Sequence, residues 1–251
     1  MFKSPIYDEY MSSFENIIRN AFMNIKVELI NFVLNFITIM FYVFIFGTIF
    51  NQQVSSYLQF IIPGLILFNI LASVSYQNLK LWSLGSAAKL MNYWLSLPMS
   101  LPTLLLSFTV MAVINTFFYV LPLILLSVIF HFSLNIGKLV IIVILSSIFL
   151  FLIMFILVLY LFKTNSFIIV FNVAQPLMLR ISPIFYPLIY LPVFSLPLVF
   201  LNPITWIVET LRSSSNTNFL LFLTFFTFID LVLFKVIITY WTKKIKTGEL
   251  C

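Results

Sequence analysis

The chain has 251 residues, of which 63% are hydrophobic and only 8% are charged, and its mean hydropathy is +1.16. Because soluble domains carry about 25% charged residues, this composition excludes a soluble globular protein and predicts a chain solvated by lipid. The net charge of +6 at pH 7 comes from basic residues scattered at the ends of apolar runs, which favours membrane orientation over nucleic-acid binding.

The first 29 residues form one of the two longest polar-rich stretches. Between Tyr7 and Ile25 apolar residues recur at helical spacing, while Glu9, Glu15 and Arg19 fall on the opposite arc. This pattern predicts an amphipathic helix that lies in the cytoplasmic interface and leads into the first span. Two roles stay open for this helix, a membrane-surface anchor and a docking site for a partner.

Long apolar runs follow this segment. A bilayer core of about 30 Å requires about 20 apolar residues per helix. The runs predict six membrane-spanning helices, at about residues 30–50, 58–76, 103–129, 139–162, 166–184 and 219–241. Pro98 and Pro102 separate the third span from the preceding loop, and Arg180 interrupts the fifth. We therefore expect an all-α integral membrane fold with one transmembrane domain over residues 1–251.

The basic residues are distributed unevenly between the two sides of these spans. Those expected on the cytoplasmic side are Lys3, Arg19, Lys26, Lys80, Lys89, Lys163, Lys243, Lys244 and Lys246. Only Lys138 and Arg212 are expected outside, with Arg180 near the outer boundary. Since positively charged loops stay inside, both termini are predicted to be cytoplasmic. The first apolar run begins too late and is too long for a cleaved signal peptide, so we expect it to stay as a signal anchor. We expect a multi-pass protein of the plasma membrane.

The segment Ile181–Arg212 is as apolar as a span, yet five prolines interrupt it. They are Pro183, Pro187, Pro192, Pro197 and Pro203. A proline inside a helix costs roughly 3 kcal/mol, so this segment is not expected to be a plain transmembrane helix. Its freed carbonyls need a protein-buried re-entrant turn or short interfacial helices. We call residues 182–212 the outer cap, and expect it to re-enter the membrane from the outer side, between the fifth and sixth spans.

The end of the outer cap has a local helix signal. Asn202 can cap a helix that Pro203 begins, so Asn202–Arg212 is predicted to be a short helix at the outer surface. Glu209 and Arg212 share one face of it at i, i+3 spacing. The simplest interpretation of this pair is an exposed ion pair, with Arg212 marking the place where the helix meets water.

Charged residues within predicted spans cost about 2.5–3.5 kcal/mol at a helix centre. Lys235 and Arg180 lie near span ends, where a long side chain can reach the interface. Asp230 in the sixth span is too short to do so. Two interpretations of Asp230 stay open, a substrate or proton pathway and an intramolecular pair.

The sequence gives no sign of catalytic chemistry. One cysteine, Cys251, and one histidine, His131, exclude disulfide frameworks and Cys/His metal clusters. There is no G-x-x-x-x-G-K-[ST] phosphate loop, and His131 falls in an expected outer loop. We therefore expect no cofactor, no metal and no enzyme acting through its own residues.

The outer cap resembles a known signature. The run Ser182–Pro187, followed by Leu191-Pro192 and by Leu201-Asn202-Pro203 up to Arg212, resembles the C-terminal signature of type-2 ABC exporter permeases. Residues Leu95–Ser100 resemble the stretch that these proteins carry before their third span. The number, orientation and length of the spans also fit this family, which includes exporters of drugs, nodulation factors and polysaccharides. Arg180 departs from the family pattern, in which an apolar or small residue is usual.

The resemblance implies a half-transporter that pairs with a second permease, as a homodimer or heterodimer, and recruits ATP-binding subunits that bind the ATP. It also implies that residues 7–26 and a coupling helix at about 84–95 contact the ATPase. In this sequence the coupling helix would include Gly85, Ser86, Lys89, Met91 and Trp94. The alternative for residues 84–95 is a solvated loop with interfacial aromatic residues.

The family leaves the cargo open between a drug, a lipid and a lipid-linked glycan. Two other classes of function also stay open. One is an ion-coupled secondary transporter with Asp230 as the coupling carboxylate, and the other is a membrane scaffold that transports nothing.

Overall fold

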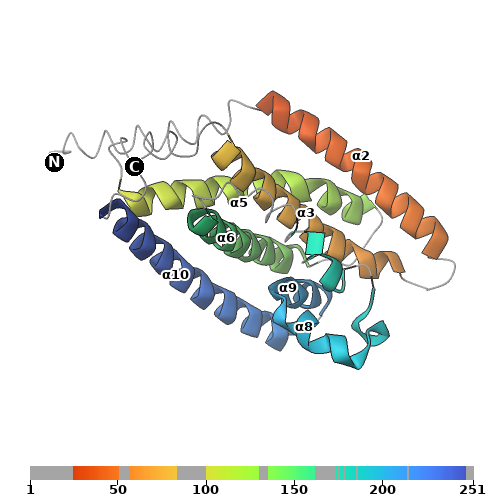
Figure 1. Ribbon diagram of the computed structural model, residues 1–251. Helices are drawn as coiled ribbons and strands as arrows, with labels where there is room; N and C mark the ends of the chain where they lie inside the picture. Colours follow the sequence, from red (N-terminus) through yellow and green to blue (C-terminus); the bar gives the residue numbers. More distant parts are fainter. Residues whose placement is uncertain are drawn as a thin grey trace.

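The computed structural model describes residues 25–50, 57–83, 100–129, 135–161, 173, 176–177, 179–184, 186–213 and 215–246, and all regular structure within these ranges is helical (Figure 1). The long helices are α2 (Ile25–Phe50), α3 (Tyr57–Ser83), α5 (Leu101–Ile129), α6 (Ile136–Leu161) and α10 (Asn216–Lys246). The outer cap contains two 3-10 turns, η2 (Leu188–Tyr190) and η3 (Val193–Ser195), and two short helices, α8 (Leu196–Leu201) and α9 (Pro203–Arg212). The expectation of an all-α fold is thus confirmed for the described residues.

Four of the described helices are long and apolar enough to cross a membrane. These stretches are Phe60–Asn78, Leu101–Val128, Ile136–Leu157 and Thr217–Lys243, and they match the second, third, fourth and sixth predicted spans. The segments Val193–Leu201 and Pro203–Arg212 pass the same test only as a pair, and they meet at an angle of 95°. These helices fit a transmembrane protein, while the total of six spans and the cytoplasmic termini stay predictions.

The two other predicted spans differ in how much of them the structure describes. The first, at 30–50, lies wholly within α2, in which Phe32–Ile45 is identified as a shorter apolar helix. Most of the fifth, at 166–184, lies outside the described residues, as do the predicted interfacial helix up to residue 24 and the predicted coupling segment at 84–95. The described end of the fifth predicted span stops being helical after Ile181, because the chain turns at Ser182–Ile184.

Helix α3 forms the centre of the bundle. It packs against α2, α5, α6 and α9, and 78% of its apolar stretch is buried, compared with 22% for α10. Hydroxyl and amide groups tie the helices around it, with Thr116 Oγ1 donating to Ser73 Oγ at 3.2 Å and Asn35 Nδ2 donating to the carbonyl of Tyr119 at 2.9 Å. Such interhelical hydrogen bonds stabilise helix packing where lipid supplies no hydrophobic driving force.

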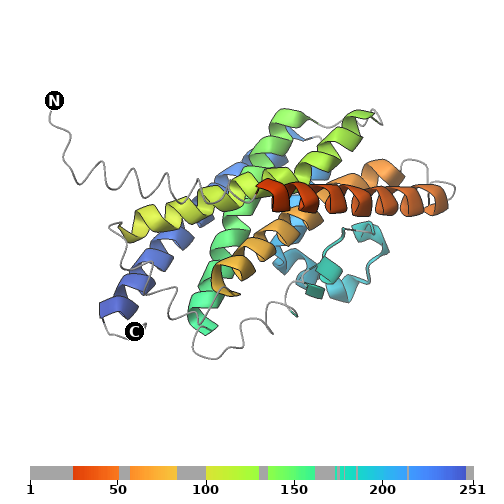
Figure 2. The same ribbon diagram turned by 90° about the horizontal axis from the view of Figure 1, so that it is seen from above.

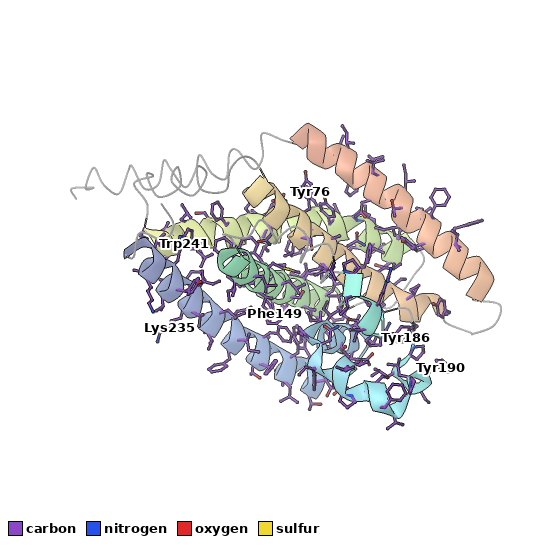
Figure 3. All side chains as sticks on the ribbon, in the orientation of Figure 1. Tyr76, Phe149, Tyr186, Tyr190, Lys235 and Trp241 are labelled. Carbon is purple, nitrogen blue, oxygen red and sulfur yellow. The ribbon has the colours of Figure 1, made fainter. Side chains whose placement is uncertain are left out.

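Helices α2 and α10 lie at opposite edges of the bundle, with α2 beside α5 and α3 (Figures 1 and 2). Both expose large apolar side chains, such as Phe41 on α2 and Leu231 on α10, as expected for surfaces that face lipid. The inner face of α10 packs on α6 through aromatic rings. Phe226 meets Phe149 edge-on, with 4.9 Å between the ring centroids. Figure 3 shows Phe149 inside the bundle.

The start of α5 corrects one predicted boundary. Pro102 was expected to lie before the third span, but it lies in the first turn of α5. A proline is tolerated there because the first N–H groups of a helix have no intrahelical partner. Ser100 caps this turn, accepting weakly from the backbone N–H of Thr103 at 3.4 Å.

Candidate functional site

The outer cap is built around a sharp break at Asn202. This residue has an extended backbone, with φ −80° and ψ 116°, and separates α8 from α9. Its Oδ1 accepts from the backbone N–H of Ile204 at 3.1 Å, so the prediction that Asn202 caps a helix beginning at Pro203 is confirmed. Its Nδ2 donates to Ser182 Oγ at 2.9 Å, which ties the break to the beginning of the cap.

Four of the five prolines of the outer cap stand where helices begin, and the fifth, Pro183, lies in the turn that opens the cap. Pro187 and Pro192 precede η2 and η3 with extended backbones, and Pro197 and Pro203 lie in the first turns of α8 and α9. In these positions the missing N–H removes no helical hydrogen bond. The prediction of short helices in place of one continuous span is therefore confirmed.

Side chains of α9 bind carbonyls at the end of α8. Thr205 Oγ1 donates to the carbonyl of Val199 at 2.6 Å, and Trp206 Nε1 donates to the carbonyl of Phe200 at 2.8 Å. These carbonyls belong to the last turn of α8, where intrahelical donors run out. The bend between α8 and α9 is thus held by hydrogen bonds across it.

Arg212 is a buried anchor, which corrects the interpretation of an exposed ion pair. Only 11% of its side chain is exposed. Its Nε donates to the carbonyl of Phe60 at 3.2 Å, and its Nη1 and Nη2 donate to the carbonyls of Pro183 and Ile184 at 2.6 Å and 2.8 Å. Nη1 also contacts Glu209 Oε1 at 3.1 Å. We call Arg212 and these three carbonyls the arginine clamp.

The guanidinium also lies 3.6 Å from the centre of the Phe60 ring, close enough for a cation–π contact. Arginine suits this role because its planar group offers donors in several fixed directions, whereas lysine offers a single ammonium. The clamp therefore fixes the C-terminal end of α9 on α3 and on the turn at the beginning of the cap.

The position of the clamp depends on the Pro63-Gly64 pair in α3. Pro63 lacks the N–H that would pair with the carbonyl of Gln59, and its ring crowds the preceding turn, in which Phe60 accepts from Arg212. Gly64 lets the turn at Ile184 come close, since a Cβ at Gly64 would lie 2.6 Å from the Ile184 carbonyl oxygen. Sequence reasoning missed this role, although a Pro-Gly pair inside an apolar run was a visible signal for a close backbone approach.

A second cation holds the other side of α9. Lys138, in the first turn of α6, donates from Nζ to the carbonyl of Ser213 and lies 5.6 Å from the centre of the Phe219 ring. The sequence identified Lys138 only as an outer basic residue. Lys138 and Arg212, the two basic residues predicted to lie outside, thus both bind backbone carbonyls. Lys138 binds the carbonyl directly after the cap, and Arg212 binds carbonyls of the cap and of α3.

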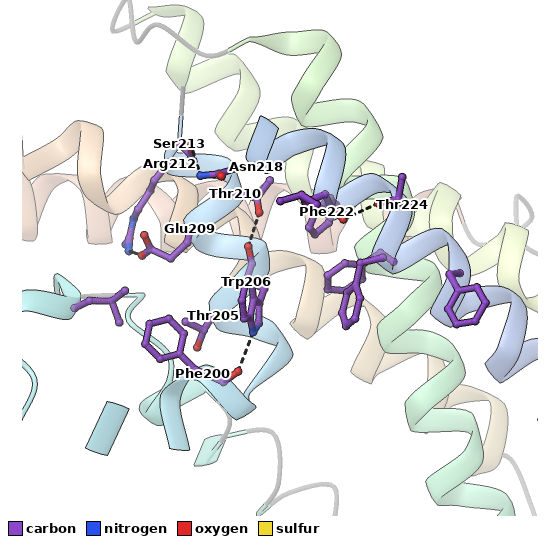
Figure 4. A pocket seen from close by; sticks show the side chains of 15 residues that line it. Phe200, Thr205, Trp206, Glu209, Thr210, Arg212, Ser213, Asn218, Phe222 and Thr224 are labelled. Carbon is purple, nitrogen blue, oxygen red and sulfur yellow. Dashed lines mark hydrogen bonds and ion pairs between the residues drawn. The ribbon is translucent and has the colours of Figure 1, made fainter. Parts of the chain in front are cut away.

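A cavity of about 940 Å³ lies between the outer cap and α10 (Figure 4). Aromatic rings form much of its wall, namely Phe200, Trp206, Phe222, Phe225, Phe226 and Phe228. Polar groups from α9 and the start of α10 complete the wall, among them Glu209, Arg212 and Asn218. Large, mostly apolar cavities with a few convergent polar groups are the usual form of small-molecule sites.

The predicted cap residues contribute to this site in different ways. Glu209 and Arg212 line the cavity, and Pro183 offers its carbonyl to the clamp. Asn202 and Pro203 set the direction of α9, while the predicted coupling residues Gly85, Ser86, Lys89, Met91 and Trp94 lie outside the described part of the chain.

Asp230 lies apart from the cavity, although it is only two residues beyond Phe228 on α10. It is 8% exposed, and neither carboxylate oxygen has a hydrogen-bond partner among the described residues. No described group therefore supports the interpretation of Asp230 as one half of an intramolecular pair. Lys235, by contrast, is exposed and points away from the bundle, as reach to the interface requires (Figure 3).

Nothing in the described residues resembles a metal centre, since no group of three or more His, Cys, Asp or Glu side chains lies together in them. In comparisons with known proteins, no family model matches the sequence and no curated protein matches it.

Proposed function

We propose that this chain is the membrane-spanning subunit of an ATP-driven exporter. The observation that carries the proposal is the outer cap: a helix pair bent by 95°, tied to α3 by the largely buried Arg212 and to α6 by Lys138, beside a cavity of about 940 Å³. An irregular backbone at membrane depth is tolerated where protein buries it or where it lines a cavity, and transporters use such broken helices at their substrate sites.

The resemblance of the cap to the type-2 ABC exporter signature supplies the direction and the energy source. On this proposal two permeases pair in the plasma membrane, as a homodimer or heterodimer, and ATP binds to partner subunits that dock on the predicted coupling segment around Gly85–Trp94. The chain itself performs no catalysis and supplies a pathway whose affinity for cargo differs between two states.

Affinity purification of the full chain from mild detergent tests the proposal. An ATP-binding subunit is expected to copurify, and its ATPase rate is expected to change when cargo is added. Replacing Gly85–Trp94 by a flexible linker of equal length should release or uncouple that subunit. If no ATP-binding subunit copurifies from native membranes, the proposal is wrong, and if the linker variant stays bound and coupled, only the coupling assignment is wrong.

Asp230 favours one rival, an ion-coupled secondary transporter. A buried carboxylate within a membrane span is costly unless it is paired or serves an ion pathway, and the described residues offer it no partner. The two functions predict different results for Asp230→Asn. Loss of gradient-driven transport in this variant, together with the absence of an ATPase partner, would establish the rival. An unchanged ATP-driven transport rate would exclude it.

A further inference from the structure

Most hydroxyl and N–H donors in the wall of the cavity are already hydrogen-bonded within the protein. Thr210 Oγ1 donates to the carbonyl of Trp206 at 2.7 Å, and Thr224 Oγ1 donates to the carbonyls of Leu220 and Leu221, both at 3.1 Å. Thr205 and Trp206 donate across the α8–α9 break, as described above. A ligand that needs donors, such as a phosphate or carboxylate, would find few of them here.

Arg212 also lines the cavity, but its donors are used within the protein. Its Nε, Nη1 and Nη2 all donate to backbone carbonyls, and its side chain is 11% exposed. The side chain of Glu209 is 40% exposed, and only its Oε1 is engaged, by Arg212 at 3.1 Å. No described residue donates to Oε2 of Glu209, so of the two charged side chains in the wall the carboxylate is the more exposed and has an acceptor left.

The apolar part of the wall lies to one side of this carboxylate. In Figure 4, Trp206 lies between the Glu209–Arg212 pair and Phe222 on α10. Along α10 the lining changes from Asn218 near the helix start to Phe228, ten residues later and therefore about 15 Å further along the axis. The cavity thus has a polar end and a long aromatic end.

We propose that this cavity binds an amphipathic organic cation, with an ammonium group at Glu209 and an aromatic or apolar body along α10. An ammonium group carries only donors, which matches a wall that offers acceptors, and it is attracted both to a carboxylate and to aromatic faces. The body buries its apolar surface against the rings of Phe222, Phe225 and Phe228. As a statement about cargo, this inference rests on the proposed export function; as a statement about binding, it stands on the cavity alone.

Three fluorescent probes of nearly equal shape test the charge preference: anthracenemethylammonium, anthracenecarboxylate and methylanthracene. Binding to the purified full chain in phosphatidylcholine nanodiscs is measured by fluorescence anisotropy, with empty nanodiscs to subtract partitioning into lipid. The cation is expected to bind about tenfold more tightly than the neutral probe and the anion to bind most weakly.

Glu209→Gln tests the assigned residue. It keeps the size of the side chain and an oxygen that can accept from Arg212, and it is expected to remove most of the preference for the cation. Trp206→Leu should weaken the binding of the cation and of the neutral probe to a similar extent, because it removes an aromatic face without changing the charge. Glu28→Gln is the matched control, since it also deletes one carboxylate but lies on α2, which lines no part of the described cavity.

Equal binding of the three probes, tighter binding of the anion, or unchanged cation binding by Glu209→Gln would each overturn the inference. The measurement needs neither ATP nor a partner subunit. If the wild-type chain shows no preference for the cation while an ATP-binding subunit copurifies with it, only the ligand class is refuted. If the wild-type chain binds the cation but no such subunit copurifies, only the export function is refuted.

Discussion

Arg212→Met should detach the outer cap from α3 while leaving the apolar stem of the side chain in place. The change removes the guanidinium from the carbonyls of Phe60, Pro183 and Ile184. A buried polar group left unpaired costs about 1–3 kcal/mol, although hydrogen bonds between membrane helices average only about 0.6 kcal/mol. At about 1 kcal/mol for each carbonyl, the free energy of unfolding should fall by about 2–4 kcal/mol.

The contact with Glu209 adds little to this figure. Its carboxylate is 40% exposed, and exposed ion pairs contribute only tenths of a kcal/mol. For a chain of this size 1 kcal/mol corresponds to about 2–4 °C, so the midpoint of thermal unfolding should fall by about 5–15 °C. Near-ultraviolet circular dichroism in one detergent, at fixed protein and detergent concentrations, measures this midpoint.

Two further variants make the result specific to the clamp. Arg212→Lys keeps the charge but not the planar fork, so it should lose roughly half as much stability. Arg180→Met removes an exposed arginine from the beginning of the same region and should shift the midpoint by less than about 1 °C. If Arg212→Met unfolds at the wild-type temperature, or if Arg180→Met is equally destabilised, the clamp does not hold the cap.

The remaining predictions concern the other supports of the cap, each measured as the same unfolding midpoint. Gly64→Ala should cost about 1–3 kcal/mol because its Cβ would press on the Ile184 carbonyl, whereas Gly137→Ala, whose nearest neighbour would be 3.6 Å away, should be neutral. Asn202→Ala should cost about 1–2 kcal/mol, and Asn202→Asp, which keeps the helix cap, should recover part of the loss; no recovery would mean that capping is not its role. Lys138→Met should cost about 1 kcal/mol, because it leaves the carbonyl of Ser213, just after α9, without this donor. The loosened cap should then be cleaved faster by added protease, and unchanged cleavage kinetics would contradict the proposed contact.

Features that depend on neighbouring residues in the chain were predictable from the sequence. The Asn202-Pro203 pair identifies a helix start because the cap needs only the next few residues, and the structure has α9 begin there. Apolar length alone similarly identified α3, α5, α6 and α10, since lipid requires a minimum span whatever the packing. The boundaries were less exact, because Pro102 is compatible with either side of a helix start.

Features that depend on distant residues were not predictable. Arg212 has an acidic neighbour at i−3, which suggested an exposed pair, but its stronger contacts are to carbonyls that a sequence pattern does not show. Phe60 is separated from it by 152 residues. The cavity could not be anticipated for the same reason, because its wall combines α9 with a face of α10 that by composition alone could equally have faced lipid or another helix.

The arginine clamp also constrains the order in which the protein is assembled. Phe60 and Lys138, which the cap needs for docking, are synthesised long before α9, so α3 and α6 can be in the bilayer when the cap leaves the ribosome. Until it docks, Arg212 lacks its acceptor at Phe60 of α3, and the carbonyl of Ser213 lacks the Lys138 donor of α6, which disfavours entry of this segment into the apolar phase alone. Docking of the cap is therefore a late step of folding, and a chain with an altered α3 would leave the cap undocked and open to proteolysis.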